Sequence, residues 1–318
     1  MRKIPVIIDC DPGHDDAIAL VMALASERLE VKAVTASPGN QTVDKTAKNA
    51  MKVLELCGRS DIPVALGVHH PILGQLVVGK EMHGETGMDG PMLPEPAMIP
   101  SEKNAVELIA DILKNSADKV TIIITGPFTN IGIFLLAYPE LKSKIEKFSV
   151  MGGGVFIGNR SPYGEFNVWN DPEAAKIVFN SGVPVEMYGL DVTHKAIIYK
   201  EEFEIFRNKK DKINQFLADL LDFFSICYMG ERKFPGCPMH DSCAVAGLID
   251  PDLFVRYDTW IDVDTQGQYS RGACVVDLRP EKRRERPDNA SVAMGVDRER
   301  FFRLIVESCD KIANSIGE

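Results

Sequence analysis

Between residues 4 and 187 the chain alternates short apolar runs with segments in which apolar residues recur every three or four positions. The runs are rich in β-branched residues, as buried parallel strands are, and the periodic segments are typical of helices. The pattern predicts strands at residues 4–8, 31–35, 64–66, 120–125, 148–151 and 183–187, with helices at 15–25, 43–56, 105–113, 130–137 and 172–179. Such alternation predicts a parallel sheet with right-handed crossovers and helices on both faces.

The last third of the chain has a different pattern. It predicts helices at residues 213–228, 241–249 and 300–316, and strands at 255–263 and 272–278 that could pair as an antiparallel hairpin. No Pro/Gly/Ser-rich linker, low-complexity tract or internal repeat divides the 318 residues, so we expect one domain spanning residues 1–318. The expected fold is α/β, with a mostly parallel, Rossmann-like open sheet and a C-terminal helical and β-hairpin cap that closes one side of a cleft.

Composition and charge indicate a globular protein that does not bind nucleic acid. The chain is 45% hydrophobic and 26% charged, which is ordinary for a globular domain, and its net charge of −10 argues against nucleic acid as a partner. A short basic run at 282–286 is interrupted by Glu285 and followed by Pro287, so we expect a solvated loop there, with nucleic-acid contact a distant second.

Hydropathy and cysteine usage bear on the compartment. No apolar stretch approaches the roughly 20 residues that cross a bilayer, and the apolar run at 4–8 is too short for the core of a signal peptide. The seven cysteines lack CxxC spacing and are expected to be reduced thiols. We therefore expect a cytoplasmic protein that has no membrane contact.

Four carboxylates fall within the eight residues 9–16, which read DCDPGHDD. The Pro-Gly pair predicts a tight turn between the first strand and the first helix. So many carboxylates are costly to bring together unless a cation lies among them, and oxygen ligands indicate Ca²⁺ or Mg²⁺ rather than zinc. Asp15 and Asp16 could instead complement the positive end of the helix, but that leaves Asp9 and Asp11 unexplained.

Three candidate stretches lie where predicted strands end. The acidic motif, Thr125 and Met151 each follow a different strand. Ligands of open α/β sheets bind beyond the carboxyl ends of the strands. These stretches are therefore expected to converge on one rim.

The segment DCDPGHDDA resembles the DxDPGxDDA signature of the inosine-uridine preferring nucleoside hydrolases. Further matches follow in the family's order over nearly the whole chain: Gly39-Asn40, His83-Gly84, Thr125-Gly126 through Thr129-Asn130, Met151-Gly152-Gly153-Gly154, Gly158-Asn159, Glu165-Phe166-Asn167 and His240-Asp241. The ordered set is far more specific than any single match. The resemblance implies hydrolysis of ribonucleosides to ribose and a free base in nucleoside salvage, with inosine, uridine or cytidine as substrate, by a homodimer or homotetramer.

The resemblance also implies a calcium site and a general base. The Ca²⁺ ligands would be the carboxylates of Asp11, Asp16 and Asp241 and the carbonyl of Thr125. Calcium takes ~6–8 oxygen ligands, so places remain for ribose hydroxyls and the attacking water. Asp11 would deprotonate that water.

The ribose would be held by polar side chains on several loops. By resemblance its hydroxyls are bound by Asp15, Asn40, Asn159, Glu165 and Asn167, and the backbone at Met151 is expected to approach the ligand closely. Such fixed dipoles and carboxylates can stabilise the positive charge that develops on the ribose. Taken alone, the Glu165–Asn167 segment could be a surface turn.

Candidate residues for the base side are fewer. His240 is the candidate general acid for the leaving base, because histidine suits proton transfer near neutral pH and Asp241 follows it. His83 is expected to contact the base, as is Tyr228, with Phe224 on the same helix face, although aromatic residues at helical spacing more often belong to a core. The other histidines are expected to be structural or solvated: His14, His69, His70 and His194.

Two departures and two alternatives remain. Ser242 stands where the family usually has proline, and Tyr163-Gly164 stands where small residues are commoner. One alternative is a phosphatase of the haloacid dehalogenase type, with Asp9 as nucleophile and Mg²⁺ as the ion, although the Pro-Gly-x-Asp-Asp continuation does not fit it. The other is a calcium- and ribose-binding protein without catalysis. The sequence does not select the preferred base.

Overall fold

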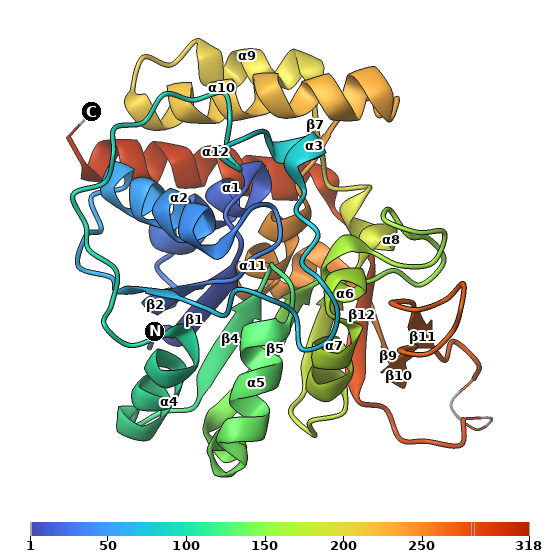
Figure 1. Ribbon diagram of the computed structural model, residues 1–318. Helices are drawn as coiled ribbons and strands as arrows, with labels where there is room; N and C mark the ends of the chain where they lie inside the picture. Colours follow the sequence, from blue (N-terminus) through green and yellow to red (C-terminus); the bar gives the residue numbers. More distant parts are fainter. Residues whose placement is uncertain (1, 281, 283, 318) are drawn as a thin grey trace.

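The computed structural model describes residues 2–280, 282 and 284–317. Within this part of the chain, one sheet of eight strands lies at the centre, with helices on both faces (Figure 1). In spatial order its strands are β3 (Val64–Leu66), β2 (Leu29–Ala36), β1 (Ile4–Cys10), β4 (Val120–Ile124), β5 (Ile145–Met151), β6 (Val185–Tyr188), β12 (Ala290–Val296) and β9 (Phe254–Thr259). Neighbouring strands are parallel except β12 and β9, which are antiparallel. The predicted α/β class with a mostly parallel open sheet is confirmed.

The sheet separates two hydrophobic cores, and β1 contributes to both. Val6 and Ile8 pack into the core on one face, whereas Ile7 packs into the core on the other. The first core includes helices α1 (His14–Ala25), α2 (Val43–Leu56), α10 (Lys212–Ser225), α11 (His240–Ile249) and α12 (Arg298–Ser315), and the second includes α4 (Ala105–Asn115), α5 (Thr129–Ala137) and α7 (Pro172–Phe179). Because both faces are covered, the central strands are continuous apolar runs.

Short elements connect and cover this framework. The short helices are α3 (Lys80–His83), α6 (Phe166–Asn170), α8 (Leu190–Thr193) and α9 (Phe203–Arg207), and short 3₁₀ segments occupy Pro139–Lys144, Lys200–Glu202 and Pro251–Leu253. Two antiparallel pairs lie outside the main sheet: β10 (Ile261–Val263) with β11 (Cys274–Val276), and β7 (Ile197–Tyr199) with β8 (Gly236–Pro238).

The C-terminal third differs from the predicted pattern in three respects. The strand expected at 255–263 is interrupted at Trp260, so that β9 joins the main sheet and only β10 forms the expected hairpin with β11. Strand β12 was not predicted, although it lies between β6 and β9. The helix expected at 213–228 ends at Ser225, and a π-helical segment, Ile226–Glu231, follows it.

The basic run is solvated, as predicted: Lys282, Glu285 and Arg286 are exposed, and Arg284 is half-buried. Arg284 donates to the carbonyl of Asp258 at 3.1 Å, and the guanidinium of Arg286 lies 4.5 Å from the centroid of the Trp260 ring. Arg283 lies outside the described residues. These contacts favour a structural role for the run.

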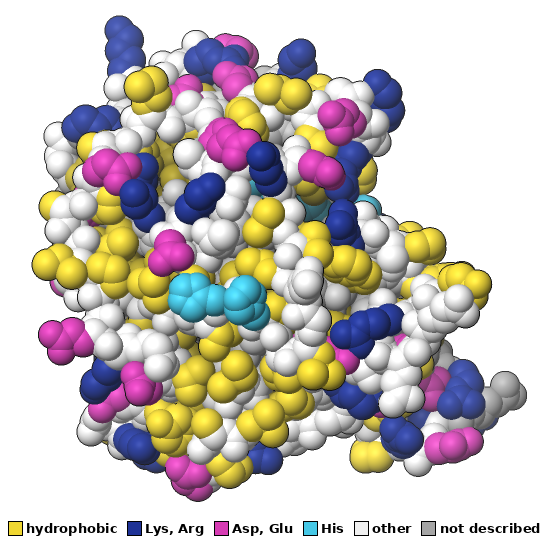
Figure 2. Space-filling model, viewed as in Figure 1, with side chains coloured by type: hydrophobic (Ala, Val, Ile, Leu, Met, Phe, Trp, Pro, Cys, Tyr) yellow, Lys and Arg dark blue, Asp and Glu magenta, His cyan; other side chains and the backbone are white. Residues whose placement is uncertain are grey.

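The surface carries charges of both signs. Basic and acidic side chains are interspersed over the face shown in Figure 2. In the described part of the chain, no helix combines the length and the apolar character needed to span a membrane.

Candidate active site

The carboxyl ends of β1, β4 and β5 open into one pocket that is lined by both polar and apolar side chains. The pocket is lined by every predicted site residue except Asp16, namely Asp11, Asp15, Asn40, His83, Thr125, Met151, Asn159, Glu165, Asn167, Tyr228, His240 and Asp241. The predicted convergence of separate strand ends is therefore confirmed.

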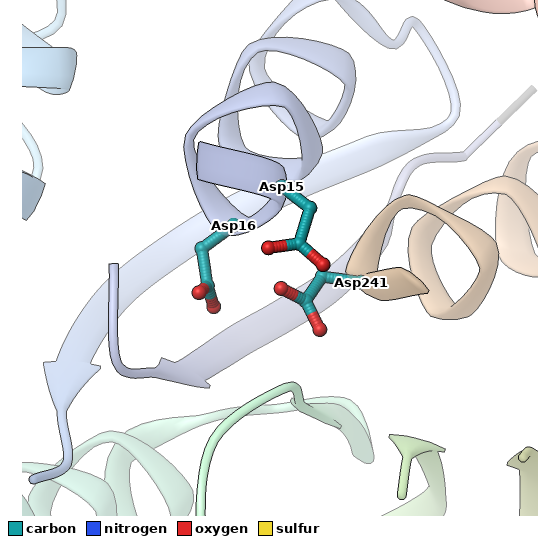
Figure 3. Close-up of side chains that lie close together, drawn as sticks. All are labelled: Asp15, Asp16 and Asp241. Atoms are coloured by element: carbon teal, nitrogen blue, oxygen red, sulfur yellow. The ribbon is translucent and has the colours of Figure 1, made fainter. Parts of the chain in front are cut away.

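A cluster of three buried carboxylates lies at one side of the pocket. Asp15 and Asp16 belong to the first turn of α1 and Asp241 to the first turn of α11, and the three side chains point toward one another (Figure 3). One carboxylate oxygen from each lies within 4.8 Å of the others. Burial raises the pKa of Asp15 to about 7 and raises that of Asp241 further, with neighbouring carboxylates adding to the effect. This acidic cluster could hold a metal ion, because a cation would offset the cost of burying these charges.

Asp11 lies beside this cluster, where the neighbouring backbone leaves little room around its carboxylate. Its Oδ2 accepts a hydrogen bond from the backbone N–H of Asn40 at 2.6 Å, and the Asn40 amide donates to Oδ2 of Asp16 at 3.1 Å. A Cβ atom on Gly39 would lie 2.1 Å from Asp11 Oδ2, and one on Gly126 would lie 2.8 Å from Oδ1. The absence of side chains at both glycines thus leaves room for the Asp11 carboxylate.

Asp9 does not share the setting of the other three motif carboxylates. Its Oδ1 accepts hydrogen bonds from the Thr35 hydroxyl at 2.5 Å and from the Asn130 amide at 2.9 Å. Burial raises the pKa of Asp9 to about 7. Asp9, to which the resemblance assigned no role, thus connects β1 to β2 and α5.

The residues expected to bind the sugar form a connected network. The hydroxyl of Thr125 donates to Oδ1 of Asp16 at 2.8 Å, and its carbonyl accepts from the Asn167 amide at 2.7 Å. Asn167 also donates to the carbonyl of Met151 at 3.2 Å. Glu165 caps α6 and accepts from the backbone N–H groups of Asn167 at 3.0 Å and Gly153 at 2.8 Å. Glu165 is therefore a functional candidate in a fixed position rather than a residue of a surface turn.

Asn159 and the carboxyl group of Glu165 complete this side of the pocket. Oδ1 of Asn159 accepts from the backbone N–H of Phe166 at 2.9 Å. Burial raises the pKa of Glu165 to about 7, although the backbone N–H groups of Gly153, Asn167, Val168 and Phe166 act in the opposite direction. A positively charged ligand nearby would therefore favour the carboxylate form of Glu165.

His240 lines the same pocket and is held between two hydroxyl groups. Its Nε2 lies 2.7 Å from the Tyr228 hydroxyl, and its Nδ1 lies 2.7 Å from the Thr193 hydroxyl. Burial lowers the pKa of His240 well below its usual value, which favours the neutral ring. Phe224 packs edge-on against Tyr228, with ring centroids 4.8 Å apart, and also lines the pocket.

His83 lines the pocket, and a second histidine, His14, supports it. Its Nδ1 lies 3.0 Å from Nδ1 of His14, whose Nε2 lies 2.7 Å from the carbonyl of Asp89. His14 also stacks on the Phe224 ring, with centroids 5.1 Å apart. The structural role predicted for His14 thus includes support for His83.

The remaining histidines and Ser242, one of the departures from the family pattern, do not line the pocket. His69 and His70 are exposed, as expected of solvated residues, and the ring of His194 lies 5.6 Å from that of His240. The side chain of Ser242 is fully buried, and its hydroxyl has no hydrogen-bond partner among the described residues.

Sequence reasoning missed several residues at the pocket. Arg232 lies over the Tyr228 ring at 5.6 Å, and its position four residues after Tyr228 could have indicated a shared helix face. Thr193 contacts His240 across 47 positions of sequence, a contact that periodicity does not predict. Other missed lining residues are Val78, Gly79, Glu81, Met82, Arg160 and Phe166.

Comparisons with known proteins agree with this geometry. The family model for inosine-uridine preferring nucleoside hydrolases matches residues 6–303. A protein of Salmonella paratyphi B named pyrimidine-specific ribonucleoside hydrolase RihA is 49% identical over 308 residues, covering 96% of this chain and 97% of that protein. The protein of the same name from Escherichia coli O139:H28 has the same identity and coverage.

Solved structures give the same family. A purine-preferring ribonucleoside hydrolase from Gardnerella vaginalis matches with a TM-score of 0.91 and 32% identity, covering 98% of this chain and 99% of that one. An inosine-guanosine nucleoside hydrolase matches with a TM-score of 0.89 and 26% identity, covering 97% and 99% of the two chains. The chain belongs to the family of inosine-uridine preferring nucleoside hydrolases, and it is a ribonucleoside hydrolase.

Proposed function

We propose that the protein is a calcium-dependent hydrolase that cleaves the N-glycosidic bond of pyrimidine ribonucleosides, giving ribose and a free base. The observation that carries the proposal is one pocket that brings together the acidic cluster, Asp11 and the Tyr228–His240 pair. Relatives at 49% identity are named pyrimidine-specific, whereas the structural neighbour at 32% identity is named purine-preferring. Uridine and cytidine are therefore the first candidates, and inosine is the third.

The donor set fits a hard divalent cation. The acidic cluster offers only oxygen atoms, it is buried, and its charges lack a cation partner among the hydrogen bonds described above. Such a set favours Ca²⁺ or Mg²⁺, and we propose calcium held by Asp11, Asp16, Asp241 and the carbonyl of Thr125. Asp15 lines the pocket whereas Asp16 does not, so Asp15 is assigned to a ribose hydroxyl. When bound, the ion neutralises the cluster and lowers the pKa of a coordinated water.

The side chains of the protein then orient the reactants. Asp11, fixed by the Asn40 backbone N–H, acts as general base for the attacking water. Asp15, Asn40, Asn159 and Asn167 bind the ribose hydroxyls, with the backbone at Met151 beside them. The carboxylate of Glu165 stabilises the positive charge that develops on the ribose as the bond breaks.

The leaving base is assisted by other residues of the same pocket. His240 is the candidate acid and acts together with Tyr228, with which it shares a 2.7 Å hydrogen bond. His83, supported by His14, contacts the base, and Phe224 supplies an apolar surface. Hydrogen bonding to the leaving group lowers the barrier because a pyrimidine anion is a poor leaving group.

We also propose a setting for the enzyme. The seven cysteines are all free thiols in the described residues, which suits the reducing cytoplasm. Residues 1–318 act as one domain, and the enzyme works as a homodimer or homotetramer without nucleic-acid or membrane partners.

Incubation of the purified protein with uridine, cytidine, inosine and adenosine, followed by chromatography of the products, tests this function. We expect uracil and cytosine to appear with equimolar ribose, and Asp11→Asn to abolish both products. A protein that binds nucleosides but releases no ribose would contradict the proposal. Faster release of hypoxanthine than of uracil would contradict the pyrimidine assignment alone.

A further inference from the structure

The two hydroxyl groups that flank His240 are not equivalent. Tyr228 lines the pocket, so its O–H group can reach water or a bound base there. Thr193 is fully buried at the end of α8, and its hydroxyl has no recorded hydrogen bond, within the described chain, other than the one to Nδ1 of His240. Whether every buried donor around the His240 ring has an acceptor therefore depends on whether Thr193 donates or accepts in this hydrogen bond.

Two arrangements of the protons are compatible with the two distances of 2.7 Å. If Nδ1 of His240 carries the proton, the Thr193 oxygen accepts it and the buried Thr193 O–H has no acceptor. If Nε2 carries the proton, the Thr193 O–H donates to Nδ1 and the Nε2–H donates to the Tyr228 oxygen. A buried donor without an acceptor is costly, whereas an unused lone pair on a hydroxyl costs less. The second arrangement satisfies every buried donor.

We propose that Thr193 is a positioning residue for the hydrolytic reaction: its hydroxyl donates to Nδ1 of His240 and selects the Nε2–H tautomer. The Tyr228 oxygen then accepts from His240, so the Tyr228 O–H points into the pocket and hydrogen-bonds to the base as negative charge develops on it. This inference rests on the proposed function. It adds the direction of the hydrogen bonds, which the distances alone do not give.

The placement of α8 supports a positioning role. The backbone N–H of Leu190 donates to the carbonyl of Gly153 at 2.9 Å, and Gly153 in turn donates to Glu165. The carboxylate of Asp191 accepts from the backbone N–H of Val155 at 2.5 Å. Four residues of α8 therefore connect the segment that holds Glu165, on the sugar side, to His240 on the base side.

The test compares two ribosides that differ in their need for help at the leaving group. Uridine has a poor leaving group, whereas 4-nitrophenyl riboside releases a stable phenolate without a hydrogen-bond donor. Thr193→Val keeps the shape of the side chain and removes the hydroxyl, and Thr193→Ser keeps the hydroxyl. Thr259→Val is the matched control, because Thr259 is equally buried and donates to the carbonyl of Asp277 at 2.6 Å, far from the pocket.

We expect Thr193→Val to lower kcat for uridine by roughly 10- to 100-fold, part of the ~10²–10⁴ that acid assistance contributes, with KM changed less than threefold. Cleavage of 4-nitrophenyl riboside should stay within about threefold, and Thr193→Ser should recover most of the uridine activity. In a double-mutant cycle, Thr193→Val should have little further effect once His240 is alanine, because the two side chains act as one unit. Equal losses on both ribosides, or a full Thr193 effect in the His240→Ala background, would overturn the inference.

A spectroscopic readout covers the case in which Thr193→Val folds poorly. In protein labelled with ¹⁵N-histidine, the His240 signals, assigned by their loss in His240→Gln, should show a pyridine-type Nδ1 and a pyrrole-type Nε2 in the wild type and in Thr193→Ser. The opposite assignment would overturn the inference while leaving the proposed function intact. Failure of the wild type to release ribose or 4-nitrophenol would instead overturn the proposed function.

Discussion

Substitution of Gly39 by alanine tests whether Asp11 must occupy one position to act as a base. The new Cβ would lie 2.1 Å from Oδ2 of Asp11 and 2.7 Å from Cδ of Pro127. The carboxylate must therefore move by roughly 1 Å to restore van der Waals contact, and Gly126 limits its movement on the other side. A misplacement of about 1 Å at a reacting group can cost ~100-fold in rate, or about 2.7 kcal/mol of transition-state stabilisation.

The assay is ribose release from uridine at saturating substrate and calcium, with thermal unfolding measured on the same samples. We expect kcat to fall by roughly 100-fold while the protein remains folded, because the closest contact is with the end of the Asp11 side chain. The contacts with the Pro127 ring, at 2.7 and 2.8 Å, should lower the unfolding temperature. Gly230→Ala is the control, since a Cβ at Gly230 would have no neighbour within 4 Å. A Gly39→Ala enzyme with wild-type kcat would refute the argument that the position of Asp11 limits the rate.

Four further outcomes are expected of the same site. Asp9→Asn should keep uridine turnover within about fivefold, whereas Asp11→Asn abolishes it; a folded Asp9→Asn protein without activity would contradict the structural role of Asp9. Burial raises the pKa of Asp9 to about 7. The protonated side chain therefore contributes stability that is present below pH ~4 and is lost as the pH rises through about 7. When unfolding is measured from pH 5 to 8, Asp9→Asn should lose less stability than the wild type. Equal slopes would argue that Asp9 titrates normally. Calcium should raise the unfolding temperature more at pH 8 than at pH 5, because the acidic cluster must lose protons to bind it and burial raises the pKa of its members; a shift that does not depend on pH would count against the cluster as the site. His240→Ala should slow uridine cleavage at least tenfold more than cleavage of 4-nitrophenyl riboside, and equal slowing would remove His240 as an assistant of the leaving base.

The architecture was predictable where the signal is local. Strand β1 is apolar as far as Ile8 because both of its faces are covered, and the turn at Pro12-Gly13 starts α1. Strand β12 was missed because the pairing that places it between β6 and β9 joins segments distant in sequence and follows a long irregular stretch. The end of α10 was misplaced because a π-helical segment continues the same apolar face.

The site residues at strand ends were predictable, whereas contacts between distant segments were not. Residues at strand ends, such as Thr125 and Met151, were brought together because parallel strands end at one edge of the sheet. The different role of Asp9 could not be foreseen, since it depends on Thr35 and Asn130 on neighbouring elements. Thr193 was missed for the same reason: its contact with His240 exists only in the folded chain.

The central claim is that Asp11, Asp16, Asp241 and the carbonyl of Thr125 hold a calcium ion needed for hydrolysis of ribonucleosides. The most direct measurement is ribose release from uridine by the purified protein before chelation, after lasting removal of divalent ions, and after calcium is restored. The account predicts that release falls to background on removal and returns with calcium, in proportion to about one bound ion per chain. Undiminished ribose release by protein shown to be free of metal would contradict it.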